Sequence, residues 1–98
     1  MFYIYTHTTN TISGSIEDTT LSIISGFVKQ IFVKSATSTT TFDFQLLDDA
    51  SNIVLNRTAS TGTLNELLEL PIHGIYTVKI LNSTVDENFV IKLVIQEI

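Results

Sequence analysis

The stretch SGFVKQIFVKSATSTTTFDFQLLDDASN, from Ser25 to Asn52, decides the fold that we expect. It contains two strand-forming runs, Phe27–Ser35 and Thr40–Leu47, joined by small hydroxyl residues. Three apolar residues of the second run alternate with polar ones: Phe42, Phe44 and Leu46. This period of two is typical of a half-buried strand. We therefore expect the two runs to form a hairpin whose aromatic face builds the core.

The first run of this stretch does not alternate cleanly. Ile31 and Val33 share one face, but Val28 falls on the other. A bulge at Lys29-Gln30 would return Val28 to the inner face and leave both lysines of the run outside. Without a bulge, Phe32 would point inward instead. We favour the bulge.

The rest of the chain alternates between short apolar segments and polar breaks. Further strands are predicted over these ranges: Phe2–Thr6, Ile12–Ile16, Leu21–Ile24, Ile53–Leu55, Gly74–Asn82 and Phe89–Gln96. Turns, loops or breaks are predicted at these positions: His7–Asn10, Glu17-Asp18, Ser25-Gly26, Asp48–Asn52, Arg57–Gly62 and Asn82–Asn88. Leu64–Ile72 has one turn of helical spacing before Pro71, but its brevity favours a strand that ends at Pro71 or lies on a sheet edge.

About eight short strands of this kind predict an all-β domain. The connections are long enough to cross between sheets. We therefore expect a two-layer antiparallel β-sandwich, either jelly-roll or immunoglobulin-like. A single domain over residues 1–98 is predicted, with residues 1–9 as a possible N-terminal arm.

Composition excludes several classes of function. The chain has 98 residues, 44% of them hydrophobic and only 15% charged, so its surface is unusually neutral. Its net charge is −5, and its five cations are scattered, which argues against nucleic-acid binding. No run approaches the roughly 18 apolar residues of a membrane span. The absence of cysteine excludes disulfides and thiolate metal sites.

The sequence offers little catalytic chemistry. His7 and His73 are the only histidines, and both fall in predicted loops. No G-x-S-x-G motif is present. Two acidic pairs could share a calcium ion if their loops met at one end of the sandwich: Asp48 with Asp49, and Asp86 with Glu87. Their spacing matches no calcium loop. We predict that the chain is not an enzyme and has no cofactor.

A carbohydrate-binding module is a non-enzymatic alternative. Such modules are often sandwiches of this size, and they stack exposed aromatic rings on sugar rings. The chain has no tryptophan, and most of its phenylalanines occupy predicted core positions. Tyr3, Tyr5 and Phe32 remain as possible platforms.

Two longer segments resemble small β-sandwich structural proteins of tailed bacteriophages. They read SGFVKQIFVKSATSTTTFDFQLLDDASNIV and LPIHGIYTVKILNSTVDENFVIKLVI. The similar features are the strand that begins at Gly26, the Thr-rich connection to an aromatic strand, the Asp turn and the Leu-Pro segment followed by a Gly-led strand. The resemblance spans roughly Gly26 to Ile95.

The resemblance implies a role in virion assembly. It implies a head decoration or auxiliary capsid protein on the capsid surface, made in the host bacterial cytoplasm, with a neck or tail component as the alternative. The implied partners are the major capsid protein or other virion proteins, together with further copies of the chain, a trimer being favoured. Candidate contact residues lie in the N-terminal segment, on the first long strand and on the outer face of the last strand: Phe2, Tyr3, Ile4, Tyr5, Phe32, Val90 and Val94.

Overall fold

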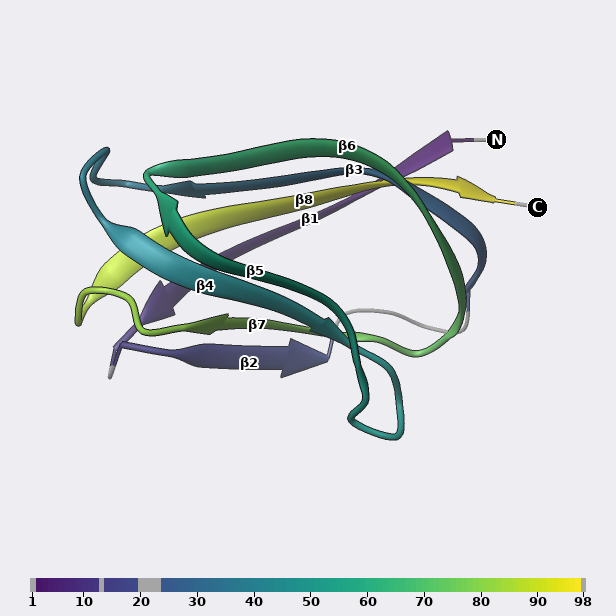
Figure 1. Cartoon of the computed structure of the whole chain (residues 1–98), viewed down its shortest axis with the longest axis horizontal. Coiled ribbons are helices and arrows are strands. Elements are labelled where there is room, and N and C mark those ends of the chain that lie inside the picture. The colour runs from purple at the N-terminus through teal and green to yellow at the C-terminus, as the bar shows by residue number, and fades with distance from the viewer. Residues whose placement is uncertain (1, 13, 20–23, 98) are drawn as a thin grey trace.

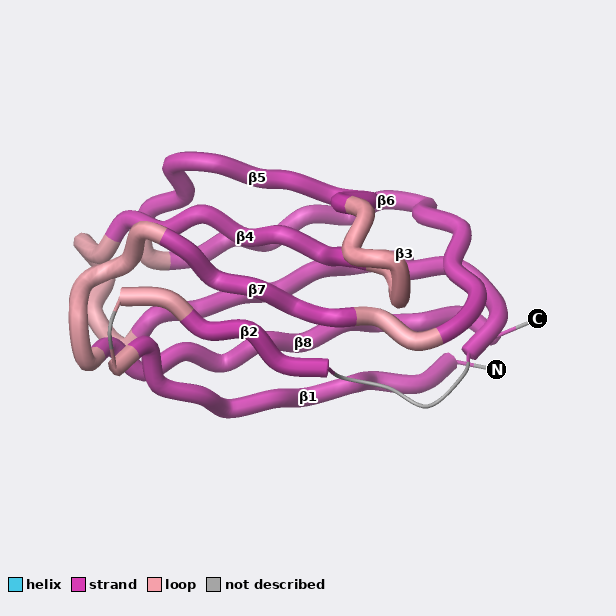
Figure 2. The backbone as a smooth tube through the Cα atoms, turned by 90° about the horizontal axis from the view of Figure 1, so that it is seen from below, coloured by secondary structure: helices cyan, strands magenta, loops and turns pink. Residues whose placement is uncertain are grey.

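The computed structural model describes residues 2–12, 14–19 and 24–97. These residues form eight strands: β1 (Phe2–Thr11), β2 (Ile16–Thr19), β3 (Ile24–Ser35), β4 (Thr41–Leu47), β5 (Ile53–Thr61), β6 (Thr63–Gly74), β7 (Thr77–Leu81) and β8 (Glu87–Glu97). The predicted all-β, two-layer antiparallel sandwich is confirmed, as Figures 1 and 2 show. No helix long and apolar enough to cross a membrane occurs among the described residues.

The strand order is that of a jelly roll. Sheet A has the order β1-β8-β3-β6, and sheet B has the order β2-β7-β4-β5. The first strand therefore pairs with the last, the second with the seventh, the third with the sixth and the fourth with the fifth. An immunoglobulin-like sandwich would instead combine four strands with three or five. The jelly-roll alternative is thus the one that the chain adopts.

The expected hairpin between the first two strand-forming runs is wrong. β3 lies in sheet A and β4 in sheet B, so the two strands face each other across the core and do not pair. The connection between them crosses from one sheet to the other, and its length is compatible with either arrangement.

The expected bulge in β3 is confirmed. The register shifts between Val28 and Gln30 against both neighbours, β6 and β8. Val28, Ile31 and Val33 are consequently all fully buried, and Phe32 lies on the outer face. The bulge thus sets which side chains of β3 face outward.

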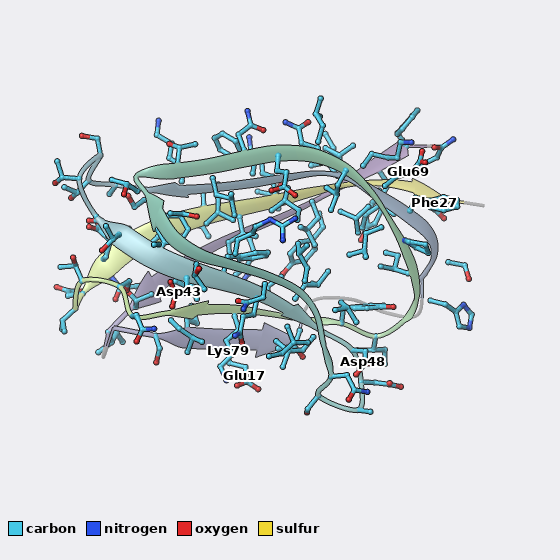
Figure 3. All side chains as sticks on the ribbon, viewed as in Figure 1. Glu17, Phe27, Asp43, Asp48, Glu69 and Lys79 are labelled. Atoms are coloured by element: carbon cyan, nitrogen blue, oxygen red, sulfur yellow. The ribbon has the colours of Figure 1, made fainter. Side chains whose placement is uncertain are left out.

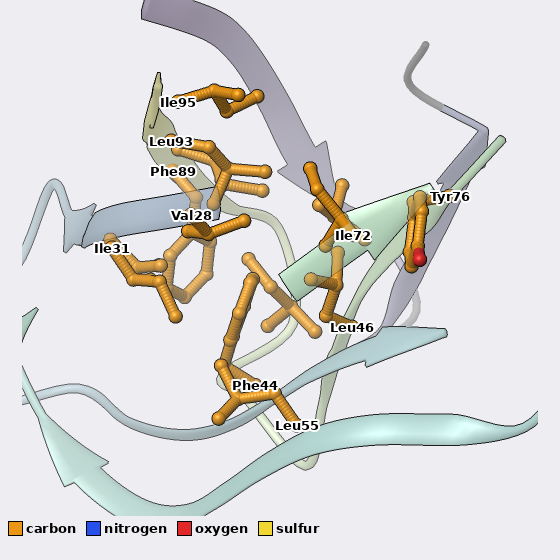
Figure 4. Packing of buried hydrophobic residues seen from close by; sticks show 14 of the residues in the cluster. Val28, Ile31, Phe44, Leu46, Leu55, Ile72, Tyr76, Phe89, Leu93 and Ile95 are labelled. Carbon is orange, nitrogen blue, oxygen red and sulfur yellow. The ribbon is translucent and has the colours of Figure 1, made fainter. Parts of the chain in front are cut away.

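The core lies between the two sheets and is built from alternate residues of the facing strands (Figure 4). Its fully buried members come from β3, β4, β7 and β8: Val28, Ile31, Val33, Phe42, Phe44, Leu46, Val78, Ile80, Phe89, Ile91, Leu93 and Ile95. Phe42 and Phe89 meet edge to face across the sandwich, with ring centroids 5.1 Å apart. The predicted core positions of β4 are confirmed.

Several predicted boundaries in the first quarter of the chain are wrong. His7–Asn10 is not a turn but part of β1, because β1 pairs with β8 as far as Thr11. Of the predicted strand Ile12–Ile16, only Ile16 lies in a strand, where it begins β2; Ile12 is in a turn, Gly14 is in a bend, and residue 13 lies outside the described residues. Glu17-Asp18, predicted as a turn, lies within β2. Of the predicted strand Leu21–Ile24, only its last residue is described, and it opens β3.

In the second half, β5 and β6 are longer than predicted. Arg57–Gly62 is not a loop, because β5 continues to Thr61 and only Gly62 separates it from β6. Gly62 has a φ of +69°, and a Cβ there would lie 2.5 Å from the Ser38 carbonyl oxygen. The strand interpretation of Leu64–Ile72 is confirmed. Pro71 lies on the edge strand β6, the kind of strand in which a residue without an N–H is tolerated.

Candidate interaction surface

The outer face of sheet A brings together predicted contact residues from three strands. Ile4 of β1 stands opposite Val94 of β8, which in turn stands opposite Gln30 of β3. Phe32 stands opposite Lys92 in the next row. These five side chains line an open depression of about 280 Å³. β-Pairing, and not proximity in the sequence, thus assembles this surface.

A second depression of about 240 Å³ continues along the same strands. Its lining residues come from β1, β3, β8 and the loop after β3: Thr8, Lys34, Ser35, Ala36, Asn88, Phe89 and Val90. The predicted contact residue Val90 stands opposite Lys34 here. The outer face therefore presents two neighbouring apolar hollows, each with a lysine on its wall.

Large apolar side chains also stand at both edges of the outer face. On β1, Phe2 is 63% exposed and Ile4 is 60% exposed. On β6, Leu67 is 79% exposed. Exposed apolar side chains that gather on one face mark an interaction site more often than scattered ones do.

The outer face is also where the unpaired positive charges lie. Three of the five cations form ion pairs: Lys29 with Glu69, Arg57 with Glu66 and Lys79 with Glu17. Among the lysines and arginines of the described chain, only Lys34 and Lys92 have no such partner. The Nζ atom of Lys92 lies 5.8 Å from the centroid of the Phe32 ring. A chain of net charge −5 thus carries a face that is apolar and locally positive.

The remaining predicted contact residues of β1 divide between its two sides. Phe2 points outward with Ile4, whereas Tyr3 and Tyr5 are partly buried and pack against the core. Their rings are therefore less accessible to a sugar than an outward-facing aromatic platform would be. Of the three proposed platform residues, only Phe32 lies on the outer face.

The two acidic pairs lie at opposite ends of sheet B, so the shared calcium site is wrong. β7 runs antiparallel to β4, which places the loop after β7 beside Asp43 and the loop after β4 at the far end. Figure 3 shows Asp43 and Asp48 well separated along the sandwich. No group of three or more metal-binding side chains occurs among the described residues.

The carboxylates of Asp48 and Asp86 accept hydrogen bonds from groups close to them. The Asp48 carboxylate accepts hydrogen bonds from the Asn52 amide at 2.8 Å and the Ala50 amide at 3.0 Å, and the Asn52 bonds hold the pKa of Asp48 below its usual value. The predicted turn Asp48–Asn52 is confirmed by these bonds. The Asp86 carboxylate accepts a bond from the Asn10 side chain, and Asp49 is simply exposed.

Glu87 is a buried carboxylate for which the described residues provide one side-chain donor. It is only 7% exposed, and its Oε2 atom accepts a hydrogen bond of 2.6 Å from the Thr40 hydroxyl. Thr40 ends the connection between the two sheets, and Glu87 begins β8. The contact therefore fixes the sheet-crossing connection to sheet A.

Both histidines lie in strands, contrary to the loops expected for them. His7 is in β1, where it stacks on Tyr5, and His73 is in β6. The Nδ1 atom of His73 forms a hydrogen bond with the hydroxyl of Ser25 on the opposite strand. The tautomer of the ring decides which of the two groups donates. No carboxylate of the described chain binds His73, so the pair lacks the third member of a hydrolytic triad. The two residues are too distant in sequence for the contact to be foreseen.

Comparisons with known proteins support the fold. No protein-family model matches the sequence, and no curated protein matches it either. A chain of the acid-stable capsid of the Helicobacter pylori bacteriophage KHP30 superposes with a TM-score of 0.62 at 11% identity, covering 96% of this chain and 86% of that one. Such low identity establishes a similar fold and nothing more.

Two further solved structures have related folds and different described roles. One is the Aeromonas hydrophila protein PliG, a periplasmic inhibitor of g-type lysozyme, with a TM-score of 0.52 at 12% identity over 95% of this chain and 85% of that one. The other is the lectin-binding domain of lectinolysin in complex with Lewis b, with a TM-score of 0.50 at 11% identity over 95% and 92%. The chain is thus similar in fold to capsid, inhibitor and carbohydrate-binding proteins alike.

Proposed function

We propose that the chain is a non-enzymatic structural protein of a bacteriophage virion. In this role it is a decoration or auxiliary protein that binds the outside of the capsid and stabilises the contacts between capsomers. The observation that supports this role is the outer face of sheet A, where Ile4, Phe32 and Val94 form an apolar hollow beside Lys92. The fold similarity to a phage capsid chain is consistent with it.

The proposed partner is the major capsid protein, through a surface that is apolar at its centre and acidic around it. Covering the hollow removes apolar surface from water, which stabilises a complex by roughly 25 cal/mol for each Å² buried. Lys34 and Lys92 would meet the acidic groups and set the orientation of docking. The chain is made in the bacterial cytoplasm and resides on the virion. The trimer implied by the resemblance stays a prediction.

A neck or tail component is the alternative within the same class, and it would use the same surface. Carbohydrate binding is less well supported, because Tyr3 and Tyr5 face the core and leave Phe32 as the single outward aromatic ring among the proposed platforms. The Phe32 ring is also partly covered by Lys92.

The test uses phage particles produced from a genome that lacks the gene for this chain. Purified protein is added to these particles, and binding is measured by co-sedimentation and located by electron microscopy. We expect saturable binding to heads, weakened roughly tenfold or more in Lys92→Glu, because the substituted side chain would repel the acidic partner. Lys79→Glu makes the same charge change on sheet B and should bind like the wild type.

The location of the bound protein separates the alternatives. Density on the tail or neck would replace decoration by the alternative role. Absence of binding to any part of the particle would overturn a virion role.

A further inference from the structure

The outward side chains of β8 form a row along the middle of the outer face of sheet A. Val94, Lys92 and Val90 occupy alternate positions of the strand, so they point to the same side of the sheet. Val94 lines the first hollow and Val90 lines the second. The two valines are four residues apart, which corresponds to roughly 13 Å along a strand. A partner that covers the row therefore meets an apolar hollow, a lysine and a second apolar hollow.

The charges along this row indicate an acidic partner. Lys92 belongs to the row itself, and Lys34 of β3 stands opposite Val90. The two lysines are thus diagonal neighbours, whose Cα atoms lie roughly 7–8 Å apart in an antiparallel sheet. Neither lysine forms an ion pair within the part of the chain that the structure describes. Two adjacent like charges without partners favour a partner that brings carboxylates to them.

The width of the apolar surface matches one helix. The strands that line the two hollows are β1, β8 and β3. The outer two of these strands lie roughly 10 Å apart, close to the diameter of an α-helix with its side chains. On the next strand, β6, the residues opposite Phe32 and Lys34 are the polar Asn65 and Thr63. In these rows the apolar surface is therefore too narrow for a second sheet.

Backbone hydrogen bonding also favours a helix. The face of a sheet presents side chains, because its backbone groups are paired within the sheet, so an extended segment lying on it would leave its own N–H and C=O groups without partners. A helix forms these bonds within itself. Residues i and i+7 or i+8 share one helix face and lie about 11–12 Å apart along the axis, close to the separation of Val94 and Val90.

We propose that the partner of the outer face of sheet A contributes an acidic amphipathic α-helix that lies along β8. Two apolar side chains of this helix, about two turns apart, occupy the two hollows. Asp or Glu side chains on the turn between them meet Lys92 and Lys34. The helix belongs to the partner of the proposed function, on which the inference therefore rests. The proposed function needs the first hollow alone, whereas a helix of this length covers both.

The test uses phage particles that lack the chain and a variant in the second hollow. We expect Val90→Glu to weaken binding to these particles roughly tenfold or more, because the new carboxylate repels the acidic helix. Thr41→Glu places the same carboxylate at an exposed position of sheet B and should bind like the wild type. Thermal unfolding checks that both variants are folded. If Val90→Glu is not, Lys34→Glu tests the same hollow.

Electron cryo-microscopy of particles with bound wild-type protein gives the second reading. We expect density for a helix along β8 over both hollows. Weakened binding of Lys92→Glu with unchanged binding of Val90→Glu would overturn the helix and leave the virion role standing. Density for a sheet or an extended segment over β8 would have the same meaning. Particles that bind no wild-type protein would overturn both the helix and the proposed function.

Discussion

At the scale of single residues, Asp43 shows how one carboxylate holds irregular backbone in place. The register between β4 and β5 shifts from Phe42 to Phe44, so that β5 has one extra residue opposite Asp43. The Asp43 carboxylate accepts hydrogen bonds from the Ala59 amide at 2.8 Å and from the Asn82 side chain at 2.7 Å. One side chain therefore ties the bulge to the loop after β7.

Replacing this carboxylate should destabilise the fold. We expect Asp43→Ala to lower the free energy of unfolding by about 0.5–1.5 kcal/mol, the net contribution of a typical hydrogen bond, because the Ala59 amide is exposed and can bond water in place of the carboxylate. Urea denaturation measures the change. Asp49→Ala removes an exposed carboxylate of the same chain and should stay within about 0.5 kcal/mol of the wild type. Equal effects of the two substitutions would contradict this role for Asp43.

The sequence was informative at this scale wherever one face of a strand is buried. The alternation of Phe42, Phe44 and Leu46 predicted their burial correctly, because neighbouring side chains in a strand point to opposite faces. It could not show that Tyr3 and Tyr5 turn inward, because both faces of β1 are apolar or amphipathic. The contact between Ser25 and His73 depends on register between distant strands, which no local pattern encodes.

At the scale of elements, the strand ends were the least predictable feature. His7–Asn10 and Arg57–Gly62 consist of residues that commonly form turns, yet both segments extend strands. Pairing with β8 and β4 overrides these local preferences, since strand propensity depends strongly on the neighbouring strand. The supposed hairpin was wrong for a related reason, because a five-residue connection can join paired strands or cross between sheets.

Gly26 shows why β3 tolerates no side chain at one position. A Cβ on Gly26 would lie 2.0 Å from the Gln96 carbonyl oxygen, which belongs to the adjacent strand β8. Gly26 therefore does not interrupt the chain before β3, as the sequence had indicated, but permits close approach within the sheet.

We expect Gly26→Ala to force β3 and β8 apart and to lower the free energy of unfolding by roughly 1–3 kcal/mol, the usual cost of overpacking. Gly74→Ala is the comparison, because a Cβ there meets no atom within 4 Å and only the backbone, with its φ of +115°, is strained. Thermal and urea unfolding of both variants measure the difference. A larger loss for Gly74→Ala would show that strain, and not the contact with Gln96, dominates.

At the scale of the whole molecule, acid should destabilise the sandwich. Four carboxyl groups have pKa values held below their ordinary values of 3.8 for Asp and 4.5 for Glu: Asp43, Asp48, Glu66 and Glu69. The causes are hydrogen bonds, from the Ala59 amide to Asp43 and from the Asn52 amide to Asp48. Hydrogen bonds from Arg57 and Lys29 act in the same way on Glu66 and Glu69.

A group whose pKa is lower in the folded state binds protons more readily when unfolded. The stability from these four groups is therefore fully present above about pH 4.5 and is lost as the pH falls through their lowered pKa values. We expect the urea midpoint to be flat above this pH and to fall below it. The double variant Asp43→Asn, Asp48→Asn should show a shallower fall, and an unchanged slope would contradict the assignment.

The fold class was predictable from the sequence, whereas the candidate surface was predictable only in part. Period-two patterns and turn residues sufficed for a two-layer sandwich. Phe32 and Val94 were expected to face outward, but only the register of β8 between β1 and β3 brings them beside Ile4. The positive charge of the face depends on which lysines form ion pairs with glutamates, as Lys29 and Lys79 do. The sequence does not show which lysines are paired in this way.

The nested order of the strands has a consequence for how the chain folds. β4 and β5 are joined by the turn Asp48–Asn52, whereas β1 and β8 pair across almost the whole chain. Closing a longer loop costs more entropy, so assembly is expected to proceed from the inside outward, with β1 the last strand to dock. Until β1 docks, one edge of β8 is unpaired, and β1 of another molecule can pair with it equally well. Rapid refolding at high concentration therefore carries a risk of strand exchange between copies, which slow dilution would avoid.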